Sequence, residues 1–167
     1  MDTAGELIFF CGKMGAGKST FASQLAQTQN AVLLSEDAWL ASLYPSQINE
    51  LADYLHYSNQ IKPLVHALVQ NILRSGANVV MDFPANTAAQ RQWFRALADS
   101  VSAAHTLIYI ECSDAQCLRH IAKRRIVQPE RAQFDTDAVF YKISAFFEAP
   151  SAVEGLNLST VTPPETP

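Results

Sequence analysis

Short apolar runs alternate along the chain with longer segments whose apolar residues recur at helical spacing. The first run, residues 7–11 (LIFFC), has no polar position and ends at Gly12, which is typical of a strand buried on both faces of a parallel sheet. Similar runs cover residues 31–34, 78–81 and 106–110, and a weaker run covers residues 156–161. This alternation predicts a three-layer α/β fold with five strands in a mainly parallel sheet.

Helix boundaries are visible in the polar residues between these runs. Thr87 with Gln90, and Ser113 with Gln116, have the spacing of a capping box, in which side chains satisfy free backbone amides at a helix start. Residues 58–75 have apolar side chains at helical spacing, which predicts a helix there. Tyr54, His56 and Tyr57 lie in the preceding segment and are candidates for an acceptor pocket or for core packing.

Two polar, proline-containing segments are predicted to lack regular structure. Residues 127–135 lie between two helical patterns and are expected to form a mobile loop. Three prolines among the last five residues predict a frayed, disordered tail over residues 163–167. We therefore expect a single domain over residues 1–162, a length that allows one hydrophobic core.

Composition and charge restrict the class of function. Hydrophobic residues make up 49% of the chain and charged residues 17%, which is typical of a globular protein. The formal net charge of −4 makes a broad basic face for nucleic acid unlikely. An odd number of cysteines, three, favours a reducing compartment, and the acidic first six residues do not resemble a signal peptide. We expect a cytoplasmic protein that does not bind membranes.

A phosphate-binding loop follows the first predicted strand. Residues 12–19 (GKMGAGKS) match the G-x-x-x-x-G-K-[ST] pattern between a strand and a helix, where glycines let backbone amides surround phosphate oxygens. Lys18 is expected to reach the β- and γ-phosphates, and the Ser19 hydroxyl is expected to bind Mg²⁺. The Asn-Lys-x-Asp pattern of GTPases is absent, which favours ATP. The predicted nucleotide-binding residues are Gly12, Lys13, Met14, Gly15, Ala16, Gly17, Lys18, Ser19 and Thr20.

Two acidic residues follow the second predicted strand, at the sheet edge where ligands bind in open α/β folds. Asp37 is our candidate for the carboxylate that orients an acceptor hydroxyl and takes up its proton, with Glu36 as the second choice. The alternative is that Asp37 only caps the helix that follows it.

A third acidic residue, Asp82, ends the predicted strand over residues 78–81. Its position is that of a Walker B carboxylate, which holds Mg²⁺ directly or through water. Asp82 could instead bind the acceptor or belong to a turn before Pro84. Asn86 and Arg91 lie just beyond, where they could touch a substrate.

Basic residues on the helix after Ser113 predict a lid. Arginine from a closing element can neutralise the charge that develops during phosphoryl transfer, and a solvated basic face is the alternative. We expect at least one arginine to act in this way, and the sequence does not single one out. The lid residues are Arg119, Lys123, Arg124 and Arg125, with Arg131 following; the candidate catalytic residues are Lys18, Asp37, Arg119, Arg124 and Arg125.

The order GKMGAGKS, SEDAW, VVMDFPANT and CLRHIAKRR resembles small P-loop kinases akin to polynucleotide kinase, zeta toxin and chloramphenicol phosphotransferase. The resemblance extends to about residue 148 and implies a P-loop NTPase fold with a five-stranded parallel sheet and a helical lid. It also implies that Lys18 and Ser19 bind phosphates and that Asp37 faces the acceptor. The segment over residues 44–75 matches no substrate domain that we can name.

Together these features predict an ATP-dependent kinase, with Mg²⁺, that transfers the γ-phosphate to a hydroxyl of a small molecule or nucleotide. One alternative is an ATP-binding regulatory module with little transfer activity. Another is a kinase acting on nucleic-acid ends, against which the acidic net charge counts. The acceptor and the oligomeric state are left open by the sequence.

Overall fold

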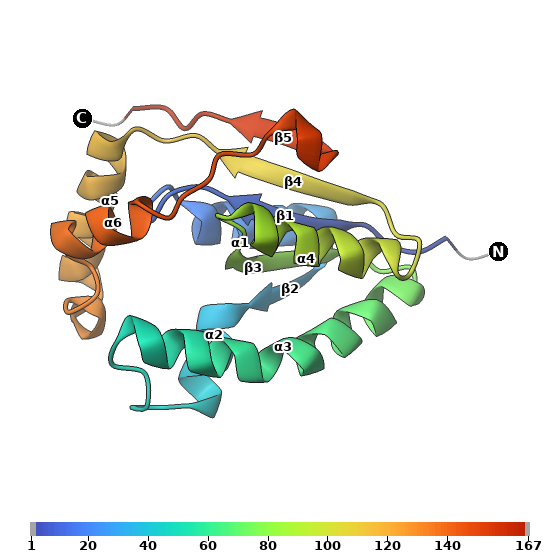
Figure 1. Ribbon diagram of the computed structural model, residues 1–167, viewed down its shortest axis with the longest axis horizontal. Helices are drawn as coiled ribbons and strands as arrows, with labels where there is room; N and C mark the ends of the chain where they lie inside the picture. Colours follow the sequence, from blue (N-terminus) through green and yellow to red (C-terminus); the bar gives the residue numbers. More distant parts are fainter. Residues whose placement is uncertain (1–2, 166–167) are drawn as a thin grey trace.

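The computed structural model describes residues 3–165, and of the predicted tail residues 166–167 lie outside the described residues. One sheet of five parallel strands runs through the molecule in the order β2-β3-β1-β4-β5. This confirms the predicted α/β fold, and the sheet is entirely parallel (Figure 1). The strands are β1 (Leu7–Cys11), β2 (Val32–Ser35), β3 (Val79–Pro84), β4 (His105–Ile110) and β5 (Leu158–Val161).

Helices cover both faces of the sheet (Figure 1). Two short 3₁₀ helices, Pro129–Arg131 (η1) and Ala152–Glu154 (η2), complete the chain. The α-helices are α1 (Lys18–Gln29), α2 (Glu36–Leu43), α3 (Leu51–Arg74), α4 (Ala88–Asp99), α5 (Asp114–Val127) and α6 (Asp137–Ser144).

The central strand, β1, is buried on both faces, as its uninterrupted apolar sequence predicts. Leu7, Phe9 and Cys11 pack into one core with α3 and α4, whereas Ile8 and Phe10 pack into a second core with α1, α5 and α6. This division follows from the strand period of two residues, which sends successive side chains to opposite faces. The phosphate loop follows β1 and is anchored in the second core, which contains Ala16 and has Met14 packed against it.

The long helix α3 begins earlier than the apolar spacing predicts. It starts at Leu51, so Tyr54, His56 and Tyr57 lie within it and not before it. Asp53 accounts for the earlier start, because its Oδ2 accepts a hydrogen bond from the backbone N–H of Glu50 at 3.2 Å and so stabilises the first turn. The apolar pattern is weak in this turn, which is why it did not reveal the helix.

The segment predicted as a loop between α5 and α6 contains regular structure. α5 continues to Val127, η1 follows, and Asp135 is completely buried. The carboxyl ends of β4 and β5 point toward the end of the molecule where α5 and α6 lie (Figure 1). Among residues 3–165, no helix is both long and apolar enough to cross a membrane.

Candidate phosphoryl-transfer site

The phosphate loop has a backbone that only glycine accommodates at two points. Gly15 and Gly17 have φ of +80° and +99°, in the left-handed region, and a Cβ on Gly15 would lie 2.6 Å from the carbonyl oxygen of Cys117. Helix α1 begins at Lys18, directly after Gly17. The N-terminal amides of α1 therefore lie at the end of a tight turn, which is an arrangement suited to binding phosphate.

Helix α5 holds this loop from one side. The carbonyl oxygen of Gly15 can only accept, so the ring of His120 donates to it from Nδ1 at 2.7 Å. Lys13 of the loop forms an ion pair with Asp114 at 2.7 Å. His120 gave no signal in the sequence because it lies far along the chain from the loop.

Lys18 lies at the centre of the site. Its ammonium donates to the carbonyl oxygens of Gly12 and of Lys13, the latter at 3.0 Å. Although part of the side chain stays exposed, burial around the ammonium lowers the pKa of Lys18 to about 8, and the negative charge of Asp82 opposes that shift. An enclosed ammonium with an anion nearby can bind phosphate oxygens strongly once they displace the carbonyl contacts.

Asp82 and Ser19 lie together at the carboxyl end of β3. The hydroxyl of Ser19 hydrogen-bonds to the Asp82 carboxylate. Burial raises the pKa of Asp82, the Ser19 hydrogen bond lowers it, and the nearby carboxylate of Asp37 raises it again. These hard oxygen atoms fit Mg²⁺. Among residues 3–165, no group of three or more His, Cys, Asp or Glu side chains could hold a metal, so phosphate oxygens and water would have to complete the shell.

Asn86 and Arg91, considered from the sequence as possible substrate contacts, both make contacts within the protein. The Asn86 side-chain oxygen accepts from the backbone N–H of Gly12 at 2.9 Å and ties the phosphate loop to the segment after β3. Arg91 is only 1% exposed and is paired with Glu154 at 2.7 Å, so its guanidinium belongs to the core. Both residues therefore have structural contacts next to the site.

The start of α2 settles the alternative considered for Asp37. The helix cap is Ser35, whose hydroxyl accepts from the backbone N–H of Ala38 at 3.3 Å. Asp37 lies inside the first turn, and its side chain is 65% exposed. Ser35 therefore fills the capping role that was the alternative for Asp37, and the exposed Asp37 carboxylate lies 3.6 Å from Nη1 of Arg131.

Glu36 is unsuited to act as the second-choice base. It is 2% exposed, and its carboxylate accepts hydrogen bonds from the hydroxyls of Tyr54 and Ser58, the latter at 2.9 Å. Burial raises the pKa of Glu36, and the two hydrogen bonds oppose that shift. Glu36 thus joins α2 to α3, and the exposed acid of the pair is Asp37.

The lid arginines are arranged around a buried carboxylate that the sequence did not indicate. Arg124 makes two hydrogen bonds to the carboxylate of Asp135, at 2.9 and 2.6 Å, and Arg125 donates to the backbone carbonyl of Asp135 at 3.1 Å. Arg119 lies further back on α5 and donates to Gln116. Of the five basic residues considered in the sequence, Arg131 faces the acceptor side, because its Nη1 lies 3.6 Å from Oδ2 of Asp37.

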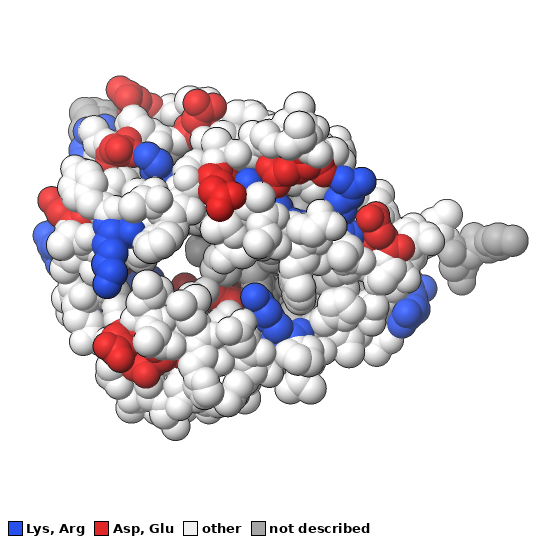
Figure 2. All heavy atoms as spheres, in the orientation of Figure 1, with Lys and Arg blue, Asp and Glu red and all other residues white. Residues whose placement is uncertain are grey.

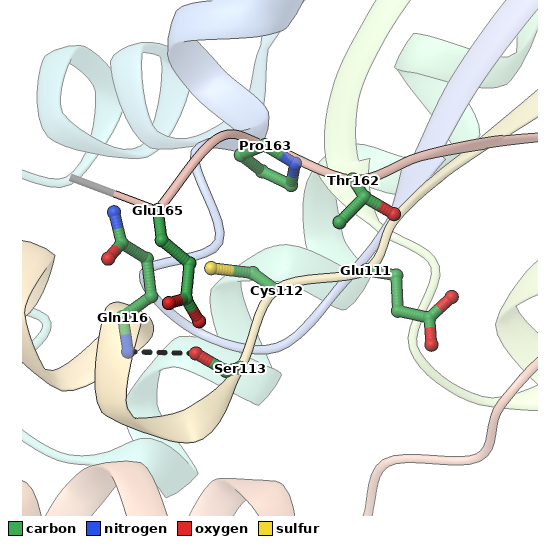
Figure 3. A pocket seen from close by; sticks show the side chains of 7 residues that line it. All are labelled: Glu111, Cys112, Ser113, Gln116, Thr162, Pro163 and Glu165. Atoms are coloured by element: carbon green, nitrogen blue, oxygen red, sulfur yellow. Dashed lines mark hydrogen bonds between the residues drawn. The ribbon is translucent and has the colours of Figure 1, made fainter.

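A pocket of about 350 Å³ opens beside the phosphate loop at the carboxyl ends of β4 and β5 (Figure 3). One wall comes from the end of β4 and the start of α5. The other comes from the segment after β5, where Pro163 and Glu165 belong to the predicted tail. The sequence offered no signal for it, since the two walls are far apart along the chain. Its lining residues are Glu111, Cys112, Ser113, Gln116, Thr162, Pro163 and Glu165.

A second hollow is visible on the face of the molecule that Figure 2 shows. In Figure 2 it opens between α3 and the elements above it, and acidic side chains are visible at its edge. On the face that Figure 2 shows, basic and acidic residues are interspersed, so no continuous basic surface is present there.

Comparison with known proteins agrees with this geometry. The sequence profile of the AAA domain family matches residues 7–150. The fold is similar to Mycobacterium tuberculosis APS kinase CysC in complex with AMPPNP and APS, with a TM-score of 0.68, 18% identity and coverage of 98% of this chain and 91% of that chain. No curated protein sequence matches.

Two further structures share the fold. A candidate kinase from Chloroflexus aurantiacus has a TM-score of 0.71 at 21% identity, covering 96% of this chain and 86% of that chain. Chaetomium thermophilum Kti12 in complex with ADP-AlF3 has a TM-score of 0.65 at 19% identity, covering 93% of this chain and 88% of that chain. At these identities the similarity establishes a P-loop kinase-like fold.

Proposed function

This chain belongs to the AAA domain family, and we propose that it is an ATP-dependent kinase that transfers the γ-phosphate to a hydroxyl of a small molecule or nucleotide. One observation carries the proposal. An exposed carboxylate, Asp37, lies at the carboxyl end of the strand next to β3, within electrostatic range of the Asp82 carboxylate that contacts Ser19 of the phosphate loop. A phosphate site and an exposed acid therefore share one sheet edge, an arrangement suited to phosphoryl transfer to an alcohol.

Each residue of the proposed site has a defined task. Backbone amides of residues 12–20 bind the phosphates, and the ammonium of Lys18 binds the β- and γ-phosphates. Ser19 and Asp82 would hold Mg²⁺, which when bound neutralises phosphate charge. Asp37 orients the acceptor hydroxyl and takes its proton. The hydroxyl oxygen then forms a bond to the γ-phosphorus as the bond between that phosphorus and the ADP oxygen breaks.

The pocket beside β4 and β5 is suited to the nucleotide base. It adjoins the phosphate loop through α5, whose contacts with Gly15 and Lys13 hold the two together. Its lining includes the carboxylates of Glu111 and Glu165, which can accept hydrogen bonds from an exocyclic amino group. We assign this pocket to the adenine of ATP.

The other functions considered from the sequence receive less support. A purely regulatory ATP-binding module was favoured by a capping role for Asp37, and Ser35 fills that role instead. A kinase acting on nucleic-acid ends would use a basic groove, whereas the chain has a net charge of −4. A small acceptor is therefore the better proposal.

The experiment that tests the proposal is a screen of hydroxyl compounds and nucleosides for acceptor-dependent ADP release. With any acceptor found, Asp37→Asn should lower turnover by about 100-fold or more and leave Mg-ATP affinity close to wild type, because the carboxylate acts on the acceptor proton alone.

Ser35→Ala is the matched control for this substitution. It removes the cap of the same helix, so it should lower stability by about 1 kcal/mol and leave turnover near wild type. Equal turnover by Asp37→Asn and wild type would contradict the role of Asp37. The absence of ATP binding by the wild-type chain would contradict the kinase proposal itself.

A further inference from the structure

The carboxylate of Asp135 has no task in the proposed reaction, yet two arginines converge on it. Asp135 is 0% exposed and lies between the end of α5 and the start of α6. Arg124 binds it through Nε at 2.9 Å and Nη2 at 2.6 Å. Nε of Arg131 lies 3.5 Å from the same carboxylate. Burying a carboxylate lowers the stability of the fold unless its charge is paired in this way.

The two hydrogen bonds restrict how the guanidinium of Arg124 can turn. The guanidinium group is planar and carries five N–H groups in a fixed geometry, so binding through Nε and Nη2 sets the plane and direction of the whole group. These two bonds use two of its hydrogens. The three others can donate to an anion on the side away from Asp135.

Two observations place Arg124 near the phosphate site. Burial is the main cause that lowers the pKa of Lys18. The positive charge of Arg124 also lowers it, to a smaller extent. Arg124 is also on the helix that contacts the phosphate loop through His120. The guanidinium therefore lies within electrostatic range of the lysine that is assigned to the β- and γ-phosphates.

We propose that Asp135 is a positioning residue that directs Arg124 toward the terminal phosphate of the bound nucleotide. The inference rests on the proposed function. Asp135 does not touch the substrate itself and acts only through the orientation of Arg124. Because Arg124 comes from the lid, its contact should be made to the γ-phosphate, so Asp135 should influence the preference for a triphosphate over a diphosphate.

The test compares the affinities of Mg-AMPPNP and Mg-ADP by calorimetric titration. Asp135→Asn keeps the size of the side chain and removes the charge that holds Arg124, so the preference for AMPPNP over ADP should fall by about tenfold, the value of one charge-assisted hydrogen bond. ADP affinity should change by less than about twofold. A loss of fold alone would weaken both ligands equally.

Asp137→Asn is the matched control, because Asp137 is an exposed acid two residues away on the same segment. It should leave both affinities unchanged. If Asp135→Asn does not fold, Arg124→Lys provides the test, since lysine keeps a charge beside Asp135 but has all its N–H groups on one nitrogen and cannot span Asp135 and a phosphate as the planar guanidinium does. It should show the same loss of preference, and a folded Arg124→Lys with wild-type preference would overturn the inference.

The double variant separates a positioning role from an independent one. If Asp135 acts through Arg124, adding Asp135→Asn to Arg124→Lys should produce no further loss of preference. Losses that add would overturn the inference, as would an unchanged preference in folded Asp135→Asn. A wild-type chain that binds neither nucleotide would overturn the proposed function as well, so the two failures are distinguishable.

Discussion

Lys18 shows how the surroundings of a single residue set a measurable property of the site. Its ammonium is enclosed, and burial lowers its pKa to about 8. The unfolded chain then binds more protons than the folded chain between about pH 8 and 10.5, so the contribution of Lys18 to stability increases as pH rises through that window. In the free protein the charge of Lys18 therefore lowers the stability of the fold, and a bound anion would offset this effect.

The same pKa predicts how nucleotide binding depends on pH. Phosphate oxygens favour the charged lysine, so Mg-AMPPNP affinity should fall above about pH 8, by at most about tenfold per pH unit. Phosphate groups titrate near pH 6 and do not contribute in this range. Calorimetry at pH 8.5 in two buffers of different ionisation enthalpy should detect proton uptake on binding. Binding without proton uptake would contradict the assignment of Lys18 to the phosphates.

At the scale of elements, a buried ion pair joins α4 to η2, just before β5. Arg91 makes two hydrogen bonds to the carboxylate of Glu154, at 2.7 and 3.1 Å, and also donates to the carbonyl of Ala85 at 3.0 Å. The hydrogen bond from Arg91 is the main cause that lowers the pKa of Glu154. Stability from this pair is therefore present at neutral pH and is lost as the pH falls through that lowered pKa.

Removing one partner of this pair should be costly. Glu154→Ala leaves the guanidinium of Arg91 buried without its anion, so it should lower the free energy of unfolding by roughly 3–5 kcal/mol, measured by denaturant titration. The exposed pair between Arg95 and Asp99, at 3.7 Å, provides the control. Asp99→Ala should change stability by less than about 1 kcal/mol. Similar small effects of the two substitutions would show that the buried pair is dispensable.

At the scale of the whole molecule, one sheet carries both cores, and we propose that residues 1–162 form a single domain. The last strand ends at Val161, whose carbonyl accepts from the backbone N–H of Glu111 at 2.9 Å. The residues that follow it line the pocket beside the phosphate loop, although the sequence predicts a disordered tail there. The end of the chain thus takes part in the proposed nucleotide site.

Truncation tests this assignment. A chain that ends at Val161 keeps all five strands but loses the wall formed by Thr162, Pro163 and Glu165. Its affinity for Mg-AMPPNP should fall by about tenfold or more. Its affinity for tripolyphosphate should not change, because that ligand occupies the phosphate loop and not the base pocket. Equal affinities of full and truncated chains for AMPPNP would place the adenine elsewhere.

The sequence by itself determined the features that depend on neighbouring residues. Strands buried on both faces, such as β1, are apolar throughout, so the fold class and the central strands could be predicted from apolar runs. The edge strand β5 is largely exposed and contains Ser159 and Thr160, so its apolar signal was weaker. The phosphate loop could be predicted because its glycines, Lys18 and Ser19 form one short segment between β1 and α1. The position of Asp37 after β2 likewise follows from local order.

Only the tertiary structure decided which side chains are free to act. It buried Glu36 against α3 and placed Arg91 in the core with a partner 63 residues away in the sequence. It also brought Arg131 to Asp37 and gathered the lid around Asp135. The physical reason is that burial, and the pairing of charges it requires, depend on elements that are distant along the chain, and a local pattern of residues does not encode them.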